Sequence, residues 1–400
     1  MNTIIEQIKH LSSTYFLETI KLRRLIHQYP ELSEHEFVTA RYICNTLKSF
    51  GIKSELLLNN TAVTATIEGN GSSKTVLGLR AETDALPIEE KGDKSYISTN
   101  KGIMHACGHD AHTASLLTTA RILTLMKDQW GGIVKLFFQP SEEKYPGGAI
   151  RMINAGVLEN PKVDMMLAMH VSPEIEIGKI GIKADNFMAS TDEIYVNIIG
   201  KGGHAALTHS YVNPIYIAAN SITELDTIFK ANAPEEFPSV LTFGRFVGEG
   251  RTNIVPDETH LEGTLRTFDE EWRKNAHKLI KKTFTKIAKE HKGEAIVHIA
   301  NGYPVLINNP EIASLCESYA NEFLGSGNVL PLQYRMTSDD FASFSHEVPS
   351  LMYRLGVKIE DKELNLHAAD FDINEKALEL SPGLMAYMAV NLLNNIKINE

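Results

Sequence analysis

The residues with the clearest capacity for chemistry lie in one nine-residue stretch, Met104-His-Ala-Cys-Gly-His-Asp-Ala-His112. Thiolate and imidazole together are ligands that suit zinc, cobalt or manganese-class ions. Cys107 and His109 are two residues apart, so they cannot share a face of a regular helix. From a loop they can converge on one ion, and Gly108 has no side chain to crowd it. A His-rich stretch can also be a surface accident, so the rest of the chain must decide.

Polar side chains follow three predicted apolar strands at the point where each strand ends. Asp84 follows residues 76–79, Glu142 and Glu143 follow residues 133–138, and His170 follows residues 163–169. Helical periodicity at 111–126 and 148–155 separates these strands, which favours a parallel or mixed sheet covered on both faces. Ligands bind such sheets beyond the carboxyl ends of the strands. We therefore expect these side chains to meet at one edge of the sheet.

Five candidate metal ligands then come from four segments of the chain: Cys107, His109, Glu143, His170 and His367. Five exceed the need of one tetrahedral site, whereas a two-metal site could share them. The thiolate of Cys107 has lone pairs to spare and is the natural bridge.

Glu142, beside the candidate ligand Glu143, is the candidate general base. Adjacent loop residues usually point apart, so one can ligate while the other faces the substrate and transfers a proton. The alternative is a solvated surface pair. Asp84 either orients a ligand or caps the turn before Pro87.

The pattern changes near residue 186, where a β-α-β-β-α-β succession begins that is typical of a split βαβ, ferredoxin-like unit. The predicted organisation is an α/β catalytic domain with a mixed, largely parallel sheet at 1–185 and 301–400, interrupted by an α+β domain at 186–300. In the inserted domain, the glycine-rich stretch Gly200–His204 is either functional or a flexible hairpin. Asn253 and Arg266 either bind a substrate carboxylate or are solvated surface residues.

Two local helix starts are predicted near the candidate site. Ser33 followed by Glu36 has the spacing of a capping box, and Asp110 suits the N-cap of the helix that follows it. Both predictions rest on local spacing alone.

Composition excludes several classes of function. The 400 residues carry a formal net charge of −11 with no Lys/Arg clusters, which argues against nucleic acid and anionic membranes. No apolar run is long enough to span a bilayer, and the N-terminus lacks a signal peptide's regions. Three widely spaced cysteines make no disulfide framework. We therefore expect a cytoplasmic protein.

Several stretches resemble the M20 metallopeptidase family, specifically its amidohydrolase branch of aminoacylase, hippurate hydrolase and auxin-conjugate hydrolase type. They run in family order along nearly the whole chain and include residues 24–36, 79–88, 104–113, 138–143, 169–170, 200–206, 253–257, 263–266 and 338–341.

The resemblance implies two divalent ions per subunit (manganese, zinc, cobalt or nickel), held by the five ligands above, with Glu142 as general base. It also implies a lid domain used for dimerisation and places Asn253 and Arg266 near the substrate carboxylate. His204 would stabilise the oxyanion, typically across the dimer interface.

The sequence departs from the family pattern at three places: Glu82 in the Arg-Ala-Asp-Met-Asp motif, residues 144–148 after the Glu pair, and Ala368-Ala369 after His367. Our hypothesis is an amidohydrolase acting on N-acyl amino acids or related conjugates. The rivals are an aminopeptidase or dipeptidase of the same superfamily, a metal-binding protein without catalysis, and a thiol-redox protein using Cys107.

Overall fold

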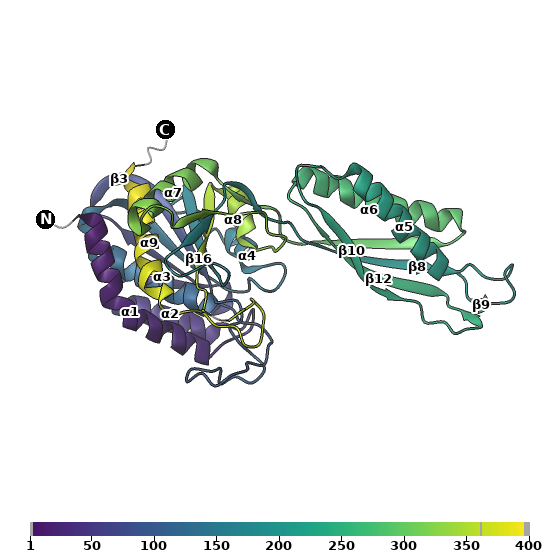
Figure 1. Cartoon of the computed structure of the whole chain (residues 1–400), viewed down its shortest axis with the longest axis horizontal. Coiled ribbons are helices and arrows are strands. Elements are labelled where there is room, and N and C mark those ends of the chain that lie inside the picture. Colours follow the sequence, from purple (N-terminus) through teal and green to yellow (C-terminus); the bar gives the residue numbers. More distant parts are fainter. Residues whose placement is uncertain (1–2, 361, 396–400) are drawn as a thin grey trace. The chain divides into compact units, whose positions relative to one another are not determined.

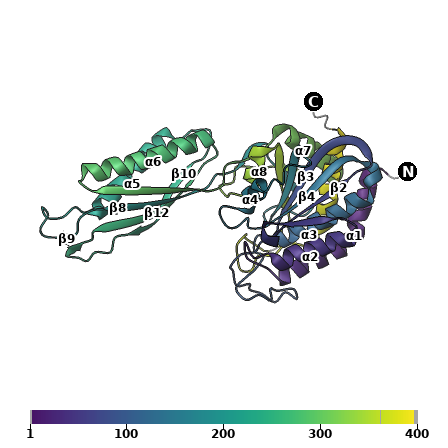
Figure 2. The ribbon, with the colours of Figure 1, turned by 180° about the vertical axis from the view of Figure 1, so that it is seen from behind.

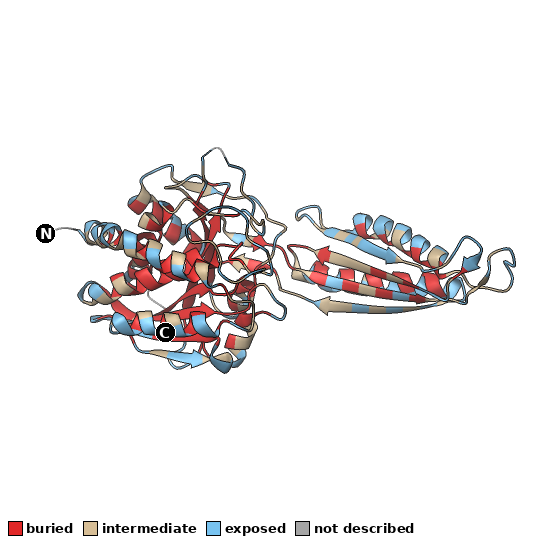
Figure 3. Cartoon of the chain, turned by 90° about the horizontal axis from the view of Figure 1, so that it is seen from below, coloured by how far each residue is buried: buried red, intermediate tan, exposed pale blue. Residues whose placement is uncertain are grey.

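The chain forms two compact units, each with its own buried interior (Figure 3). A computed structural model describes residues 3–360 and 362–395. The first unit holds the described residues of 3–185, 307–333 and 340–395, and the second holds 186–306 and 334–339. The second unit thus extends past residue 300 and takes in a short segment from later in the chain.

The first unit is built on a mixed sheet, which confirms the predicted α/β class. Among the described residues it has eight strands in the order β1-β2-β4-β3-β5-β16-β6-β15, and the four central ones, β4, β3, β5 and β16, are parallel. Figure 2 shows β2, β3 and β4 of this sheet. The strands are β1 (Ser54–Leu57), β2 (Ala62–Glu68), β3 (Gly71–Glu82), β4 (Gly131–Gln139), β5 (Met165–Ser172), β6 (Ile180–Ile182), β15 (Val329–Pro331) and β16 (Ser350–Gly356).

Helices cover both faces of this sheet, with α1, α3 and α9 on one side and α4 and α8 on the other (Figure 1). The helices of the unit are α1 (Ile4–Gln28), α2 (Phe37–Ser49), α3 (His109–Leu125), α4 (Gly148–Asn154), α7 (Pro310–Leu324), α8 (Phe341–Glu347) and α9 (Ala377–Asn395), with 3₁₀ turns at Leu58–Asn60 and Lys127–Gln129. Because successive strand residues face opposite sides, Phe138 joins the core under α3, while the Phe137 ring lies 5.9 Å from that of Phe344 on α8.

The order in which the chain adds strands to the sheet reverses at β3, and this reversal determines where the site lies. From β3 the chain passes through α3 to β4 on one side and then to β5 on the other. A crevice forms outside the carboxyl end of a strand where the order reverses in this way. Glu82 ends β3, and Asp84 follows directly.

The second unit has the strand order β10-β12-β8-β13, all antiparallel, with α5 and α6 on one face (Figure 1). Its elements are β8 (Asp192–Ile199), α5 (Pro214–Asn232), β10 (Val240–Val247), β12 (Glu258–Arg266), α6 (Glu270–Glu290) and β13 (Glu294–Asn301), with a ribbon of β9 (Gly203–His204) and β11 (Ile254–Val255). Along β8 the buried Ile194, Val196 and Ile198 face the helices. This is the split βαβ arrangement. Strands β7 (Asp185–Met188) and β14 (Leu306–Asn308) cross the unit boundaries in sequence.

Both predicted helix starts near the site are wrong. Glu36 is itself the N-cap of α2 and makes no side-chain cap, and the Ser33 hydroxyl bonds Asp84 instead. Gly108 is the N-cap of α3, and Asp110 lies in its first turn, where it pairs with Arg23 and His27. Tertiary partners decide the roles of these polar side chains.

Candidate active site

Cys107, His109 and His170 come together at the carboxyl edge of the sheet. Gly108 adopts φ +85°, which turns the chain into α3, and a Cβ there would lie 2.6 Å from Val171 Cγ2. Only glycine fits both this conformation and this space. His170 lies inside β5 rather than after a strand, and its Nε2 is 3.5 Å from the Cys107 sulfur.

Backbone carbonyls orient both histidines. His109 Nδ1 donates to the carbonyl of Asp84 at 2.8 Å, and His170 Nδ1 donates to the carbonyl of Val171 at 2.8 Å. Each Nε2 is then the ring nitrogen left for a metal, which binds it once that nitrogen carries no proton. His109 Nε2 is buried and has no hydrogen-bond partner among the described residues.

Glu142, Glu143 and His367 complete the cluster. Glu142 Oε2 and Glu143 Oε1 lie 3.8 and 3.9 Å from His109 Nε2, and Glu143 Oε1 is 3.1 Å from His367 Nε2. His367 lies in a loop, and its own backbone N–H donates to the carbonyl of Ala106. The donors form groups that include Cys107–His109–His170 and Cys107–Glu143–His367, each with its atoms within 4.8 Å of one another. The sulfur of Cys107 is common to both groups.

The charges of the cluster fit divalent cations. Burial raises the pKa of the Cys107 thiol well above its usual value, and Glu143 and Glu142 raise it further. Burial opposes protonation of His109, but Asp84 and Glu82 outweigh it and raise its pKa to about 10. Burial lowers the pKa of His170 well below its usual value, which keeps that ring neutral. Cations would neutralise the surplus of carboxylates and stabilise the thiolate that ligation requires.

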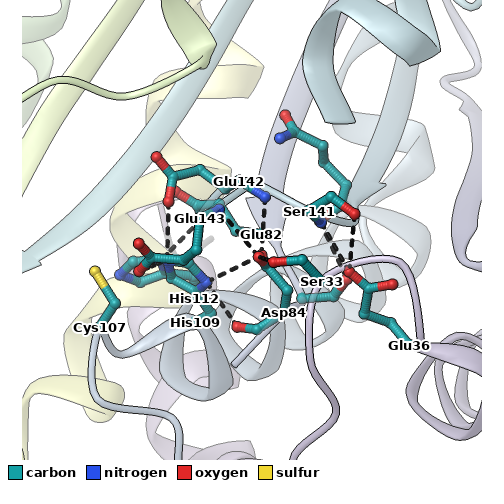
Figure 4. Close-up of polar contacts among 12 residues, drawn as sticks. Ser33, Glu36, Glu82, Asp84, Cys107, His109, His112, Ser141, Glu142 and Glu143 are labelled. Atoms are coloured by element: carbon teal, nitrogen blue, oxygen red, sulfur yellow. Dashed lines mark hydrogen bonds and ion pairs between the residues drawn. The ribbon is translucent and has the colours of Figure 1, made fainter. Parts of the chain in front are cut away.

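Asp84 lies at the centre of the hydrogen bonds that hold the glutamate pair (Figure 4). Its Oδ1 accepts the N–H of Glu142 at 3.1 Å, and its Oδ2 accepts the N–H of Glu143 at 3.0 Å and the Ser33 hydroxyl at 2.7 Å. Burial would raise the pKa of Asp84, but His109, the Glu143 amide and Ser33 lower it below its ordinary value. Asp84 therefore orients the surrounding groups as a carboxylate.

Glu36 and Ser141, which the sequence did not suggest as site residues, continue this network (Figure 4). Glu36 Oε1 accepts the N–H of Ser141 at 2.8 Å and lies 3.3 Å from its hydroxyl. Both side chains are buried. The sequence contains a signal, because Glu36 belongs to a stretch that matches the family, but the spacing of Glu36 from Ser33 also fits a capping box.

His112 and Glu82 lie next to the candidate ligands. His112 Nδ1 donates to Glu82 at 2.9 Å, and its Nε2 accepts the N–H of Val171 at 3.0 Å. Glu82 in turn pairs with the buried Arg80. The extra methylene of Glu82, relative to the family's aspartate, is thus accommodated in a paired, buried position. His105 is buried as well, and burial lowers its pKa to about 3.

His204, Asn253 and Arg266 belong to the second unit. His204 lies on β9 opposite Ile254 of β11, and the carbonyl of Asn253 accepts the N–H of Ala205. His204 and Asn253 are therefore neighbours. Arg266 ends β12 and bonds the Ser338 hydroxyl at 3.4 Å. No described carboxylate forms an ion pair with Arg266, and burial lowers its pKa.

Residues 78–390 match the model of the Peptidase family M20/M25/M40. The chain belongs to this family. It is 36% identical over 383 residues to an N-acetyl-L-cysteine deacetylase of Bacillus subtilis, a match that covers 96% of this chain and 90% of the relative. An N-acyl-L-amino acid amidohydrolase of Geobacillus stearothermophilus is 38% identical over 306 residues, 76% of this chain and 82% of the relative.

Solved M20 structures share the fold. A Bacillus subtilis protein described as a dinuclear metal-binding peptidase from the M20 family superposes with a TM-score of 0.84 at 29% identity, covering 96% of this chain and 99% of that one. The family resemblance found in the sequence is confirmed. Within the described residues, none of the helices combines the length and apolar character needed to cross a bilayer.

Proposed function

We propose that this protein is a dinuclear metal-dependent amidohydrolase that cleaves the amide bond of N-acyl amino acids. The observation that carries the proposal is the pair of donor groups that share Cys107, with the Glu142 carboxylate beside them. Relatives named as a deacetylase of N-acetyl-L-cysteine and an amidohydrolase of N-acyl-L-amino acids support the substrate class.

Two divalent cations of the manganese, zinc, cobalt or nickel kind would be held by Cys107, His109, Glu143, His170 and His367, and Cys107 belongs to both of the donor groups described above. When bound, such ions act as Lewis acids for a carbonyl and lower the pKa of water from about 15.7 to about 7. The mixed thiolate, imidazole and carboxylate donors suit these metals.

Glu142 is the proposed proton carrier. Its carboxylate is largely buried, and its Oε2 lies 3.8 Å from His109 Nε2, at the border of the ligand cluster. Glu142 Oε2 would take a proton from the attacking water and later give it to the leaving amine nitrogen. The same carboxylate then carries out both proton transfers. General acid–base catalysis of this kind contributes a factor of about 10²–10⁴ to the rate.

The second unit would act as a lid that supplies substrate contacts. We infer that His204 stabilises the developing oxyanion and that Arg266 and Asn253 bind the substrate carboxylate. The half-buried guanidinium of Arg266, which forms no ion pair with a described carboxylate, supports this role, because burying a charge without a counter-ion is costly unless a ligand offsets the cost. A cytoplasmic homodimer formed through the lid completes the proposal.

The deciding experiment combines elemental analysis with a hydrolysis screen of N-acetyl and longer N-acyl amino acids. We expect about two divalent ions per subunit, release of free amino acid, loss of activity after chelation and recovery on adding manganese, zinc, cobalt or nickel. A metal-free preparation with undiminished hydrolysis would overturn the proposal and favour chemistry at the Cys107 thiol.

A peptidase is the second candidate, because the family model itself describes peptidases. Parallel assays with dipeptides that have a free α-amino group separate the two. A higher kcat/KM for dipeptides than for matched N-acetyl amino acids would replace the proposed substrate class.

A further inference from the structure

Three consecutive backbone amides, those of Ser141, Glu142 and Glu143, are held by two carboxyl groups from distant parts of the chain. Glu36 on the turn before α2 accepts the first, and Asp84 after β3 accepts the second and third. The segment that carries the proposed base and an adjacent metal ligand is therefore fixed residue by residue (Figure 4).

Ser141 needs such a partner because its backbone is strained. It adopts φ +56° without being a glycine, a conformation that costs an L-residue about 1–2 kcal/mol. This left-handed residue lies in the segment between β4 and α4. The hydroxyl of Ser141 also accepts the N–H of Glu34 at 2.8 Å, so the residues before α2 hold the turn at two points.

We propose that Glu36 is a positioning residue for amide hydrolysis, which holds the left-handed turn at Ser141 and thereby aims the Glu142 carboxylate. The inference rests on the proposed function, since it assigns Glu36 a role through the proposed base. Glu36 does not contact the ligands Cys107, His109 or Glu143 in any hydrogen bond or ion pair that the described structure shows.

The surroundings of Glu36 indicate that its acceptor oxygen matters more than its charge. The side chain is fully buried, and its Oε2 has no hydrogen-bond partner among the described residues. Burial, with Asp84 adding to it, raises the pKa of Glu36 to about 8. The carboxyl group is then mostly protonated near neutral pH, and a glutamine amide, which also offers a carbonyl oxygen, should replace it well.

Glu31 provides a matched control on the same turn. Its carboxylate accepts the N–H groups of Val38 and Thr39 and the Thr39 hydroxyl, so it caps α2. It makes no side-chain contact with residues 141–143 among the described hydrogen bonds. Removing it costs about 0.5–2 kcal/mol of stability without releasing the Ser141 turn.

The test compares steady-state kinetics, thermal unfolding and metal content of the full-length, metal-loaded enzyme. For Glu36→Ala we expect kcat to fall by about 10²-fold, because a small misplacement of a catalytic group has that effect, with KM and metal content near wild type. Glu36→Gln should retain kcat close to wild type. Glu31→Ala should lower the unfolding temperature and leave kcat unchanged.

Glu36→Met keeps the test decisive if the alanine variant does not fold, because it fills the same volume without an acceptor oxygen. A wild-type kcat in Glu36→Met or Glu36→Ala overturns the positioning role. So does a Glu36→Gln variant as slow as Glu36→Ala, since the acceptor would then not be what matters.

A double variant separates this inference from the proposed function. If Glu36 acts through Glu142, adding Glu36→Ala to Glu142→Gln should lower the residual kcat no further. A full additional loss would overturn the inference. If Glu142→Gln itself retained wild-type kcat, the proposed mechanism would fail first, whatever the result at Glu36.

Discussion

At the scale of single residues, we propose separable roles for the two adjacent glutamates, although both lie near His109. Glu143 also reaches His367 and belongs to a donor group with Cys107, whereas Glu142 is proposed to carry the proton. Such a division predicts different consequences when each carboxylate is replaced by its amide.

Glu142→Gln should lower kcat by about 10²–10⁴-fold, the usual contribution of a general acid–base, while the metal content stays at the wild-type value. Elemental analysis and initial rates on one preparation check both. Glu143→Gln is the matched change and should lose metal together with activity. A Glu142→Gln enzyme that hydrolyses N-acyl amino acids at the wild-type rate would contradict the assignment of the base.

The shared sulfur makes a second residue-scale prediction. Because Cys107 belongs to two of the donor groups, whereas His367 joins Cys107 in the group with Glu143, Cys107→Ala should lose both ions and His367→Ala should retain one. Metal-to-protein ratios after gel filtration in metal-free buffer distinguish the variants. Equal losses in the two variants would argue against a bridging cysteine.

At the scale of elements, Gly108 links the loop of the candidate ligand Cys107 to helix α3. Its φ of +85° costs a side chain about 1–2 kcal/mol, and the 2.6 Å approach of a Cβ to Val171 adds an overpacking cost of about 1–3 kcal/mol. Gly156 has a similar φ of +80° with nothing within 4 Å of its Cβ position, so it serves as control.

Gly108→Ala should therefore destabilise the protein more than Gly156→Ala, and it alone should lower metal content. Urea unfolding of the metal-free variants gives the first difference, and elemental analysis gives the second. If both variants lose the same stability and keep their metals, the close contact with Val171 does not position the ligands.

The elements themselves were largely predictable because their patterns are local. Helical periodicity at 111–126 and 148–155 predicts two helices, and the structure has α3 at His109–Leu125 and α4 at Gly148–Asn154. The strand predicted at 133–138 is β4 at Gly131–Gln139. The ends of strands β3 and β4 likewise predicted where Asp84 and the glutamate pair would meet.

The two wrong helix-cap predictions have one physical cause: hydrogen-bond partners that are distant in sequence compete with the neighbouring backbone for the same side chains. Ser33 and Glu36 have the spacing of a capping box, yet their side chains bond Asp84 and Ser141, which are 51 and 105 residues away in sequence. Asp110 has the sequence position expected of an N-cap, but its carboxylate forms an ion pair with the buried Arg23. A pattern of neighbouring residues in the sequence cannot identify partners that are so far away along the chain.

At the scale of the whole molecule, the chain leaves the first unit and returns to it, so the two units have separate cores. The succession of elements indicated an inserted unit, but the addition of residues 334–339 to that unit had no local signal. Separate cores imply that a charge buried in the second unit can be tested without changing the ligand cluster in the first.

Asp192 is such a charge. Its carboxylate binds Arg273 at 2.6 and 2.9 Å and His277 at 2.6 Å, which joins β8 to α6. Burial would raise the pKa of Asp192, but the hydrogen bonds from Arg273 and His277 outweigh it and lower the pKa below the ordinary value. A carboxylate with a lowered folded-state pKa stabilises the fold above its unfolded pKa, and this stabilisation is lost as the pH falls through the folded value.

Asp192→Asn should therefore destabilise the second unit by about 3–5 kcal/mol at pH 6, the cost of breaking a buried pair. The difference from wild type should shrink once the pH falls below about 4, the unfolded pKa of aspartate, because the unfolded chain then takes up a proton that the folded carboxylate, with its lowered pKa, takes up only at lower pH. Hydrogen exchange of β8 and α6 amides at pH 6 and pH 3 measures this difference, and the α3 amides of the first unit serve as internal control. A difference that stays constant between the two pH values would show that the charge of Asp192 does not stabilise the unit.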